Sequence, residues 1–395
     1  MSESSRREDK KDTGGTGEQP QLHRDAGRRL QQELSNLFPI PDEAATQYAG
    51  NVPKLSAQVD EQVLRKLSVS DLIGACPVEV IRTNHRNHGR FMAAVFVLDL
   101  PSLLMQVVPW AYRVYTARGV SADYFRAELA AWIDAVQSQL DPAHARPICR
   151  LYRWMIDHHD TMQELARNVT QSSFVTGDWS SELESLLGCL LKGDSTGARR
   201  MAEESAPEAG DLPKFYVDRV QPVMYRIGDL WAEGEVSVAQ EHMATALISR
   251  IMAATYQRFE LFKPSKGKVV VACATDEFHE IGARTVADLL ELDGWDVMFI
   301  GANVPEEDFH STVVDVQPEI VALSAAVPSH LLRMKGMVDG VRAESSLAHT
   351  RTMVGGLALN VAPEASDKLA VDGSAQDGRH AQKLAHQWWE EGIWD

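Results

Sequence analysis

The chain has 395 residues, which is enough for two or three domains. Hydrophobic residues make up 44% and charged residues 24%, as is usual for a globular protein. The 39 Lys and Arg residues against 56 Asp and Glu residues leave a net charge of −17, which excludes a surface that coats nucleic acid through clustered cations. The sequence contains no run of about 18 apolar residues, so no membrane span is expected.

The N-terminal segment is polar. We predict that residues 1–33 form a disordered tail, because such a segment buries too little apolar surface to offset its loss of conformational entropy. The cysteines Cys76, Cys149, Cys189 and Cys273 are far apart and form no C-x-x-C pair, which indicates neither a zinc site nor a disulfide framework. A reducing, cytoplasmic location is therefore expected.

Residues 34–177 are predicted to form an all-helical domain. One helix follows Ser121, which is a suitable N-cap residue, and ends near Pro142. A second helix is expected from about Pro147 to Val169, with His158 on its apolar stripe. No alternation typical of strands interrupts this part of the sequence.

Residues 180–262 are predicted to form a four-helix bundle. A short amphipathic helix ends near Gly193, and a later turn is expected at Gly234. Ser237 and Gln240 fit the S-x-x-Q capping box at the start of the last helix.

From residue 266 to residue 395 the hydrophobic pattern changes, because short β-rich runs alternate with amphipathic helical segments. The runs read KVVVACA, WDVMFIG, EIVALSA and RTMVGG. Strands that alternate with helices predict βαβ units and a Rossmann-like parallel sheet. Ligands of such sheets bind beyond the carboxyl ends of the strands. The loops that follow these strands are therefore the candidate functional segments.

The loop after the first strand holds Glu277, His279 and Gly282. A histidine in such a loop can ligate a metal through one ring nitrogen, while a carboxylate two residues earlier holds the other nitrogen. Gly282 would stand at the start of the following helix, where it places no side chain in the way of a ligand. The alternative is that His279 is a solvated loop histidine and the glycines are ordinary turn residues.

One spaced pattern runs through three of the loops: Glu277-x-His279-x-x-Gly282, Ser324 and Gly355-Gly356. It resembles the DxHxxG…S…GG signature of cobalamin-binding domains, with Glu in place of Asp. The segment from Trp231 to Ala246 resembles the W-x9-E-H segment of light-sensing repressors of the CarH type. The preceding helices resemble the bundle that caps cobalamin in methionine synthase. The resemblance covers about residue 180 to the C-terminus.

The resemblance implies roles for the matched loop residues. His279 is the lower cobalt ligand in place of the nucleotide base, the base-off and His-on form, and Glu277 orients it. Ser324 bonds the buried dimethylbenzimidazole tail of the cofactor, and Gly355 and Gly356 flank that tail.

The resemblance also implies roles for the bundle. Trp231 stacks over the upper corrin face, Glu241 bonds the adenosyl group of adenosylcobalamin, and His242 lies near it; the alternative for Trp231 is a core residue of the bundle. In the light-sensing repressors a histidine that captures cobalt after photolysis follows this tryptophan, but here the residue is Ala232. A bis-histidine product from that position is not expected, and a winged-helix DNA-binding segment is not visible either.

The helical domain ahead of this module holds a second candidate site. Arg82, His85, Arg86 and His88 crowd one short stretch, and guanidinium groups pair bidentately with carboxylates. Arg82, His85, Arg86 and His158 are thus candidates for the pocket of a tetrapyrrole. The alternative is a core histidine and a solvated basic helix face.

A globin-like helical domain ahead of a cobalamin module resembles the photocobilins, and the segments PVEVIRTNHRNHGR, ARGVSADYF and LYRWMIDHH are similar to them. This resemblance implies a bilin such as biliverdin, held without a covalent bond. Haem, with His158 as axial ligand, is the competing tetrapyrrole.

The resemblances together predict a light-responsive sensory protein that binds adenosylcobalamin and a bilin. Photolysis of the Co–C bond would change its conformation or assembly. No output enzyme motif is visible, so we expect no enzyme, but a homo-oligomer (a dimer) with a downstream protein partner and no direct binding to DNA or membrane. The alternatives are a corrinoid protein that shuttles methyl groups in a methyltransferase system and a haem- or redox-sensing regulator.

Overall fold

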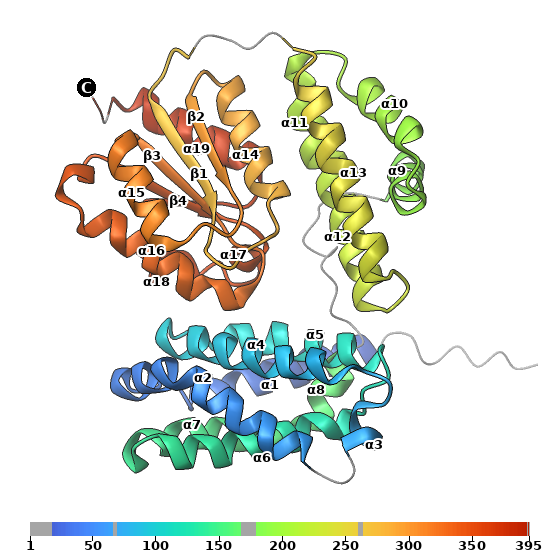
Figure 1. Cartoon of the computed structure of the whole chain (residues 1–395), viewed down its shortest axis with the longest axis vertical. Helices are drawn as coiled ribbons and strands as arrows, with labels where there is room; N and C mark the ends of the chain where they lie inside the picture. Colours follow the sequence, from blue (N-terminus) through green and yellow to red (C-terminus); the bar gives the residue numbers. More distant parts are fainter. Residues whose placement is uncertain (1–17, 66–68, 167–178, 260–263, 393, 395) are drawn as a thin grey trace, which may run out of the picture.

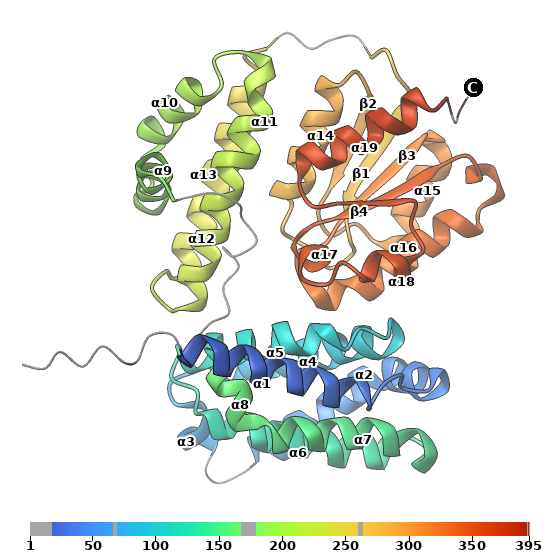
Figure 2. The same cartoon turned by 180° about the vertical axis from the view of Figure 1, so that it is seen from behind.

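The computed structural model describes residues 18–65, 69–166, 179–259, 264–392 and 394. These residues form an N-terminal helical region, a helical bundle and a sheet region, in that order along the chain (Figure 1). The bundle and the sheet region stand side by side, and the N-terminal helical region lies across one end of both (Figures 1 and 2). Helical parts followed by a parallel sheet confirm the predicted fold class.

The N-terminal helical region contains α1 to α8. Their bounds are α1 Glu18–Ser35, α2 Asp42–Leu64, α3 Val69–Ile73, α4 Val78–Val97, α5 Ser102–Thr116, α6 Ala122–Gln139, α7 Pro142–Asp157 and α8 His159–Leu165. Ser121 is the N-cap of α6, and its side chain accepts a hydrogen bond from the backbone N–H of Asp123, as predicted.

Helix α1 corrects the prediction of a tail over residues 1–33. Residues 18–35 are helical, and Leu30 and Leu34 are fully buried. These leucines are four residues apart and share one helix face, so α1 can bury them in the core of the helical region although most of its residues are polar. Residues 1–17 lie outside the described residues.

The helix predicted over 147–169 is also corrected. Helix α7 ends at Asp157, and α8 begins at His159, so the apolar stripe changes direction between them. His158 caps the break and its side chain is 23% exposed, whereas the neighbouring His159 is buried and bonds the hydroxyl of Tyr112 at 2.7 Å. Residues 167–169 lie outside the described residues.

The bundle consists of four helical rods. Their elements are α9 Ser181–Lys192, α10 Ser195–Ser205, a continuous run of η3 Ala209–Asp211, α11 Leu212–Phe215, η4 Tyr216–Val220 and α12 Gln221–Ala232, and finally α13 Val238–Tyr256. The predicted capping box is present, because Ser237 accepts from the N–H of Gln240 and the Gln240 side chain accepts from the N–H of Ser237. Gly193 ends α9 in the left-handed conformation.

The sheet region contains five parallel strands in the order β2-β1-β3-β4-β5. The elements are β1 Lys268–Cys273, α14 Ile281–Leu292, β2 Asp296–Gly301, α15 Glu306–Val316, β3 Ile320–Ser324, η5 Pro328–His330, α16 Leu331–Ala343, η6 Ser345–Leu347, β4 Arg351–Gly355, α17 Leu357–Val361, α18 Ala365–Leu369, β5 Gly373–Ala375 and α19 Gly378–Glu390. Helices α14 and α19 cover one face of the sheet, and α15 and α16 cover the other.

The strand order creates a switch point between β1 and β3. The chain leaves β1 toward β2 on one side and returns to β3 on the other, so the loops after β1 and β3 diverge and leave a crevice. Ligands of open α/β sheets bind at this position. The loop after β1 is the one that holds Glu277 and His279.

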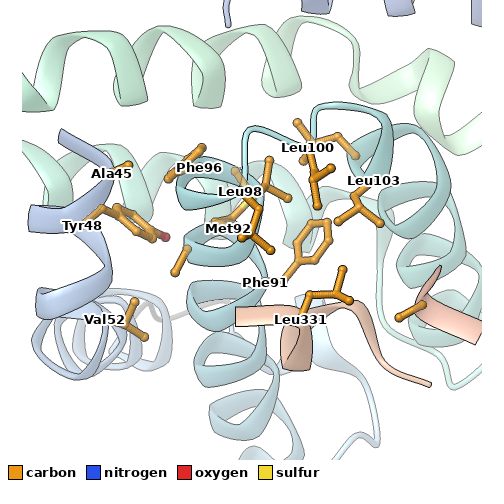
Figure 3. Packing of buried hydrophobic residues seen from close by; sticks show 14 of the residues in the cluster. Ala45, Tyr48, Val52, Phe91, Met92, Phe96, Leu98, Leu100, Leu103 and Leu331 are labelled. Atoms are coloured by element: carbon orange, nitrogen blue, oxygen red, sulfur yellow. The ribbon is translucent and has the colours of Figure 1, made fainter. Parts of the chain in front are cut away.

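Apolar and ionic contacts join the three parts. Figure 3 shows Leu331, at the start of α16, against Phe91 of α4, so the core of the helical region continues into the sheet region. The guanidinium of Arg379 on α19 pairs bidentately with Asp218 of the bundle, at 2.7 and 2.8 Å. Among the described residues, we find no helix with the length and apolar character that a membrane span requires.

Candidate functional site

A cavity of about 1120 Å³ lies where the three parts meet. The loops after β1, β3, β4 and β5 form one wall, and α12 and α13 form the opposite wall. Helices α4 to α7 of the N-terminal region line a further part of it. The cavity opens at the carboxyl ends of the strands, where the sequence predicted a ligand.

Glu277 connects His279 to the next loop. The side chain of Glu277 is fully buried, and its Oε1 accepts from the backbone N–H of His279 at 3.0 Å and from the ring Nδ1 at 2.5 Å. Its Oε2 accepts from the backbone N–H groups of Ala326 and Val327, at 2.8 and 3.0 Å, and lies 3.1 Å from Nδ1 of His330. Every lone-pair direction of this buried carboxylate thus has a protein partner.

The electrostatics of the pair fix the histidine tautomer. Burial opposes ionisation of Glu277, but the hydrogen bonds from His279 and His330 outweigh it and hold the pKa of Glu277 well below its usual range. The hydrogen bond to Glu277 also raises the pKa of His279. With Nδ1–H donating to the carboxylate, the lone pair of neutral His279 is on Nε2. The side chain is 65% exposed and lines the cavity, as a metal ligand must.

Glycines keep the floor of the cavity free of side chains. A Cβ at Gly355 would lie 2.7 Å from the carbonyl oxygen of Ala375. Gly356 has φ of +100°, and a Cβ there would lie 2.3 Å from the carbonyl oxygen of Ala325. Gly282 is different, because a Cβ there would meet nothing within 4 Å. Gly355 and Gly356 are therefore required by the backbone, whereas Gly282 leaves open space in the cavity.

Every residue predicted to contact cobalamin lines this cavity, with the exception of the buried Glu277. Ser324 is the last residue of β3 and lies in register with Gly355 on β4. On the opposite wall, Trp231 comes from the end of α12 and Glu241 and His242 from the first turn of α13. Glu241 accepts from Thr245 at 2.9 Å and lies 2.6 Å from Nδ1 of His242. The predicted residues from the two parts therefore face one space.

A single histidine is not a complete metal site. Among the described residues, no group of three or more His, Cys, Asp or Glu side chains is placed to hold a metal ion. His279 can therefore hold only a metal that brings most of its own ligands, as the metal of a tetrapyrrole does. The volume of the cavity, the side-chain-free glycine floor and the oriented Nε2 fit such a macrocycle.

The arm of the cavity in the N-terminal helical region is polar at its end. Asn84, His88 and Glu128 line it, and Glu128 is only 2% exposed. Burial raises the pKa of Glu128 and lowers the pKa of His88 to about 3. The indole Nε1 of Trp110, another lining residue, is buried without a hydrogen-bond partner among the described residues. Such groups suit a ligand that offers both donors and acceptors.

The residues predicted for a bilin pocket have partners outside the large cavity. Arg82 and Arg86 are about half exposed and pair with Glu79 on their own helix. His85 is buried between Asp60 and Tyr124, at 2.5 and 2.8 Å. His158 pairs with Glu33 at 3.0 Å.

None of Arg82, His85, Arg86 and His158 lines the large cavity. Arg82 and Arg86 are four residues apart and share the exposed side of α4, whereas His85 is buried against the neighbouring helices, so the four residues do not turn toward one space. Of the basic stretch, only His88 reaches the cavity.

Sequence reasoning missed two kinds of residue. His330, which holds the second oxygen of Glu277, lies 53 positions away, and no local pattern indicates it. Glu128 was hidden among helical residues, although a lone Glu on an apolar helix face is a usable sign of a buried site.

Comparisons with known proteins agree with this site. A family model described as a B12 binding domain matches residues 267–385, and a second model with the same description matches residues 182–256. Neither model extends into the N-terminal helical region. The bundle and the sheet region therefore form a B12-binding module, and the chain is a cobalamin-binding protein.

Individual relatives align with part of the chain, from about a quarter to about half of it. Monomethylamine corrinoid protein 1 of Methanosarcina mazei is 25% identical over 213 residues, which are 51% of this chain and 94% of that protein. The HTH-type transcriptional repressor CarH of Myxococcus xanthus is 30% identical over 111 residues, 28% of this chain and 36% of the repressor. The solved monomethylamine corrinoid protein of Methanosarcina barkeri has a TM-score of 0.44 and 21% identity, and the match covers 51% of this chain and 94% of that chain.

Proposed function

We propose that this B12-binding protein is a light-responsive sensor. It holds adenosylcobalamin between the bundle and the sheet region, and a bilin such as biliverdin in the cavity arm of the N-terminal helical region. The output is a change of conformation or assembly that a downstream protein reads, without an enzymatic step, DNA binding or a membrane. Its place of action is the cytoplasm.

The residues of the sheet region hold the lower side of the cofactor. Nε2 of His279 would be the ligand to cobalt, and the hydrogen bond from Nδ1 to Glu277 would fix the orientation of the ring. Ser324, Gly355 and Gly356 surround the nucleotide tail, because the two glycines leave room where other residues have side chains. The bound cofactor supplies a Co–C bond that visible light breaks.

The residues of the bundle would contact the side of the cofactor that faces away from His279. Trp231, Glu241 and His242 face the cavity from the ends of α12 and α13. Contacts of these side chains with a group above the bound cofactor would stabilise one position of the bundle relative to the sheet region. Only such differential contacts shift a conformational equilibrium.

The observation that carries the proposal is the third wall of the cavity. Helices α4 to α7 line the cavity beside α12 and α13, and the Trp110 and Trp231 rings lie 6.4 Å apart at 29°. A helical region in this position covers the side of the cavity that a methyltransferase would have to reach. It is instead well placed to detect changes at Trp231.

The bilin is supported by the chemistry of the cavity arm. The arm is lined by aromatic side chains and by His88, Asn84 and Glu128, which can bond pyrrole N–H and carbonyl groups. This set replaces the four residues that the sequence suggested.

The second candidate is a methyl-shuttling corrinoid protein. The observation in its favour is that the relatives named above include monomethylamine corrinoid proteins aligned over 94% of their length. Such a protein has the bundle and the sheet region but needs an accessible upper face of its cofactor.

One experiment separates the two functions. The full chain is purified in darkness, loaded with adenosylcobalamin with or without biliverdin, and illuminated. A sensor gives a spectral change with release of an adenosyl product, a far-red band with biliverdin, and a light-dependent change of mass or shape in solution. Methyl transfer that is independent of light, with no spectral change on illumination, would favour the shuttle.

A further inference from the structure

The end of α5 meets the turn between α12 and α13. Gly234, in this turn, has φ of +79°, and a Cβ there would lie 3.3 Å from the carbonyl oxygen of Ala117, just after α5. Arg113 of α5 forms a partly buried ion pair with Glu233 of the turn. The N-terminal helical region is therefore packed against the bundle at the residues that immediately follow Trp231.

Arg118 contacts Trp231 in two ways. Its Nη2 donates to the backbone carbonyl oxygen of Trp231 at 2.8 Å, and its guanidinium carbon lies 4.3 Å from the centroid of the indole ring. Its Nη1 donates to the carbonyl oxygen of Val114 at 2.7 Å, which fixes the guanidinium to the last turn of α5. One planar group thus contacts both the backbone and the ring of Trp231 and is itself held by α5.

These contacts lie at the wall of the cofactor cavity. Trp231 and Trp110 both line the cavity, and their rings are stacked. The indole of Trp231 is thus held from the helical region and not only by the bundle to which it belongs.

We propose that Arg118 is a positioning residue that holds the indole of Trp231 over the cavity, so that the N-terminal helical region determines how this side chain covers the cobalamin. Arg118 acts only through Trp231, since it does not line the cavity itself. The inference rests on the proposed place of adenosylcobalamin beneath Trp231.

The consequence is a two-way coupling. A change in the helical region that moves the end of α5 shifts the Trp231 side chain relative to the cofactor site. Conversely, a displacement of Trp231 shifts Arg118 and the end of α5. By linkage, the two effects have the same free energy.

The test is a double-mutant cycle on the full chain, with adenosylcobalamin affinity measured in darkness. A cation–π contact and a charged hydrogen bond of this kind are worth about tenfold in an equilibrium constant. We expect Arg118→Gln to weaken binding about tenfold in the wild-type background and to have no further effect in a Trp231→Ala background. Arg126→Gln, which removes an exposed arginine paired with Asp160, is the matched control and should bind like the wild type.

A second measurement uses the cofactor-free protein. The fluorescence of Trp231, taken as the difference between wild type and Trp231→Ala, should become more accessible to acrylamide in Arg118→Gln. If the glutamine variant does not fold, Arg118→Lys enters the same cycle, because it keeps the charge but loses the planar group that stacks on the indole.

The outcomes separate the two hypotheses. Wild-type protein that does not bind adenosylcobalamin would overturn the proposed function. Binding that Trp231→Ala weakens but Arg118→Gln leaves unchanged would overturn only the role of Arg118. An equal effect of Arg118→Gln with and without Trp231 would also overturn it, since Arg118 would then act through another residue.

Discussion

The sheet region and the N-terminal helical region line the same cavity but place their residues in different ways. In the sheet region the site residues stand at the carboxyl ends of parallel strands, and the loops after β1, β3 and β4 meet because those strands are neighbours. In the helical region the lining residues come from α4, α5, α6 and α7, far apart in sequence and without a common position in their helices.

The difference teaches which kinds of site a sequence reveals. The end of a strand has a fixed position in the fold, so Glu277 and His279 after β1, and Ser324 at the last position of β3, can be expected near the ligand. The side chains of a helix point in all directions around its axis. A small error in the predicted helix position therefore assigns the wrong side chain to the ligand. His158 and His159 illustrate this, because these adjacent residues have side chains that are 23% and 2% exposed.

The largest effect is expected from the sheet region. His279→Ala removes the ring nitrogen that Glu277 orients in the loop after β1, and we expect cobalamin affinity to fall by about 100-fold with a changed absorption spectrum. Titration with hydroxocobalamin, followed by absorbance, measures both. His386→Ala, on α19 away from the cavity, is the control. Unchanged affinity and spectrum in His279→Ala would end the ligand assignment.

The next prediction distinguishes Gly356, which the backbone requires, from Gly282, which leaves open space in the cavity. Gly356→Ala combines a positive φ with a Cβ 2.3 Å from a carbonyl oxygen, and should destabilise the fold by about 2 kcal/mol in urea unfolding. Gly282→Ala has open space around its Cβ and should keep its stability while lowering cobalamin affinity. Unchanged cobalamin affinity in Gly282→Ala would show that the cofactor does not approach Gly282.

The helical region is tested by comparing the sequence-based site with the structural one. Glu128→Gln replaces a buried carboxyl of the cavity arm by an amide and should weaken biliverdin binding about tenfold, whereas Arg86→Gln, on an exposed face, should not. Fluorescence quenching on addition of biliverdin measures both. A larger loss of biliverdin affinity in Arg86→Gln than in Glu128→Gln would favour the pocket predicted from the sequence.

The smallest effect concerns the junction of the bundle and the sheet region. Asp288 accepts from the hydroxyl of Tyr216 at 2.8 Å, and burial raises the pKa of Asp288 from 3.8 to about 6. The folded state therefore binds a proton more tightly than the unfolded state, so this carboxyl costs stability as the pH rises from about 4 to about 6.

Asp288→Asn cannot ionise and keeps an acceptor for Tyr216. The shift alone corresponds to about 2 kcal/mol between pH 4 and pH 7, and solvent contact of the partly exposed Asp288 reduces it. Relative to the wild type, the free energy of unfolding of Asp288→Asn should therefore rise by about 1 kcal/mol over this range. Urea unfolding at several pH values measures this difference, and Asp315→Asn, an exposed aspartate, is the control. A difference that does not change with pH would contradict the raised pKa.

The sequence by itself determined the order of helical parts and sheet, the capping box at Ser237, and the strand-end residues around His279. These follow from local periodicity and from the rule that parallel strands end at one edge, so they need no knowledge of distant contacts. The resemblance of residues 231–246 to light-sensing repressors also implied that Trp231, Glu241 and His242 face the cofactor, and all three line the cavity.

Only the tertiary structure decided what the helical region adds. It buried Leu30 and Leu34 in place of a tail, turned Arg82 and Arg86 to solvent, and brought Glu128 to the cavity. His330 on Glu277 and Arg118 on Trp231 join segments 53 and 113 residues apart. Such contacts depend on how whole helices pack, since each helix exposes several faces with similar local patterns and packing alone selects among them.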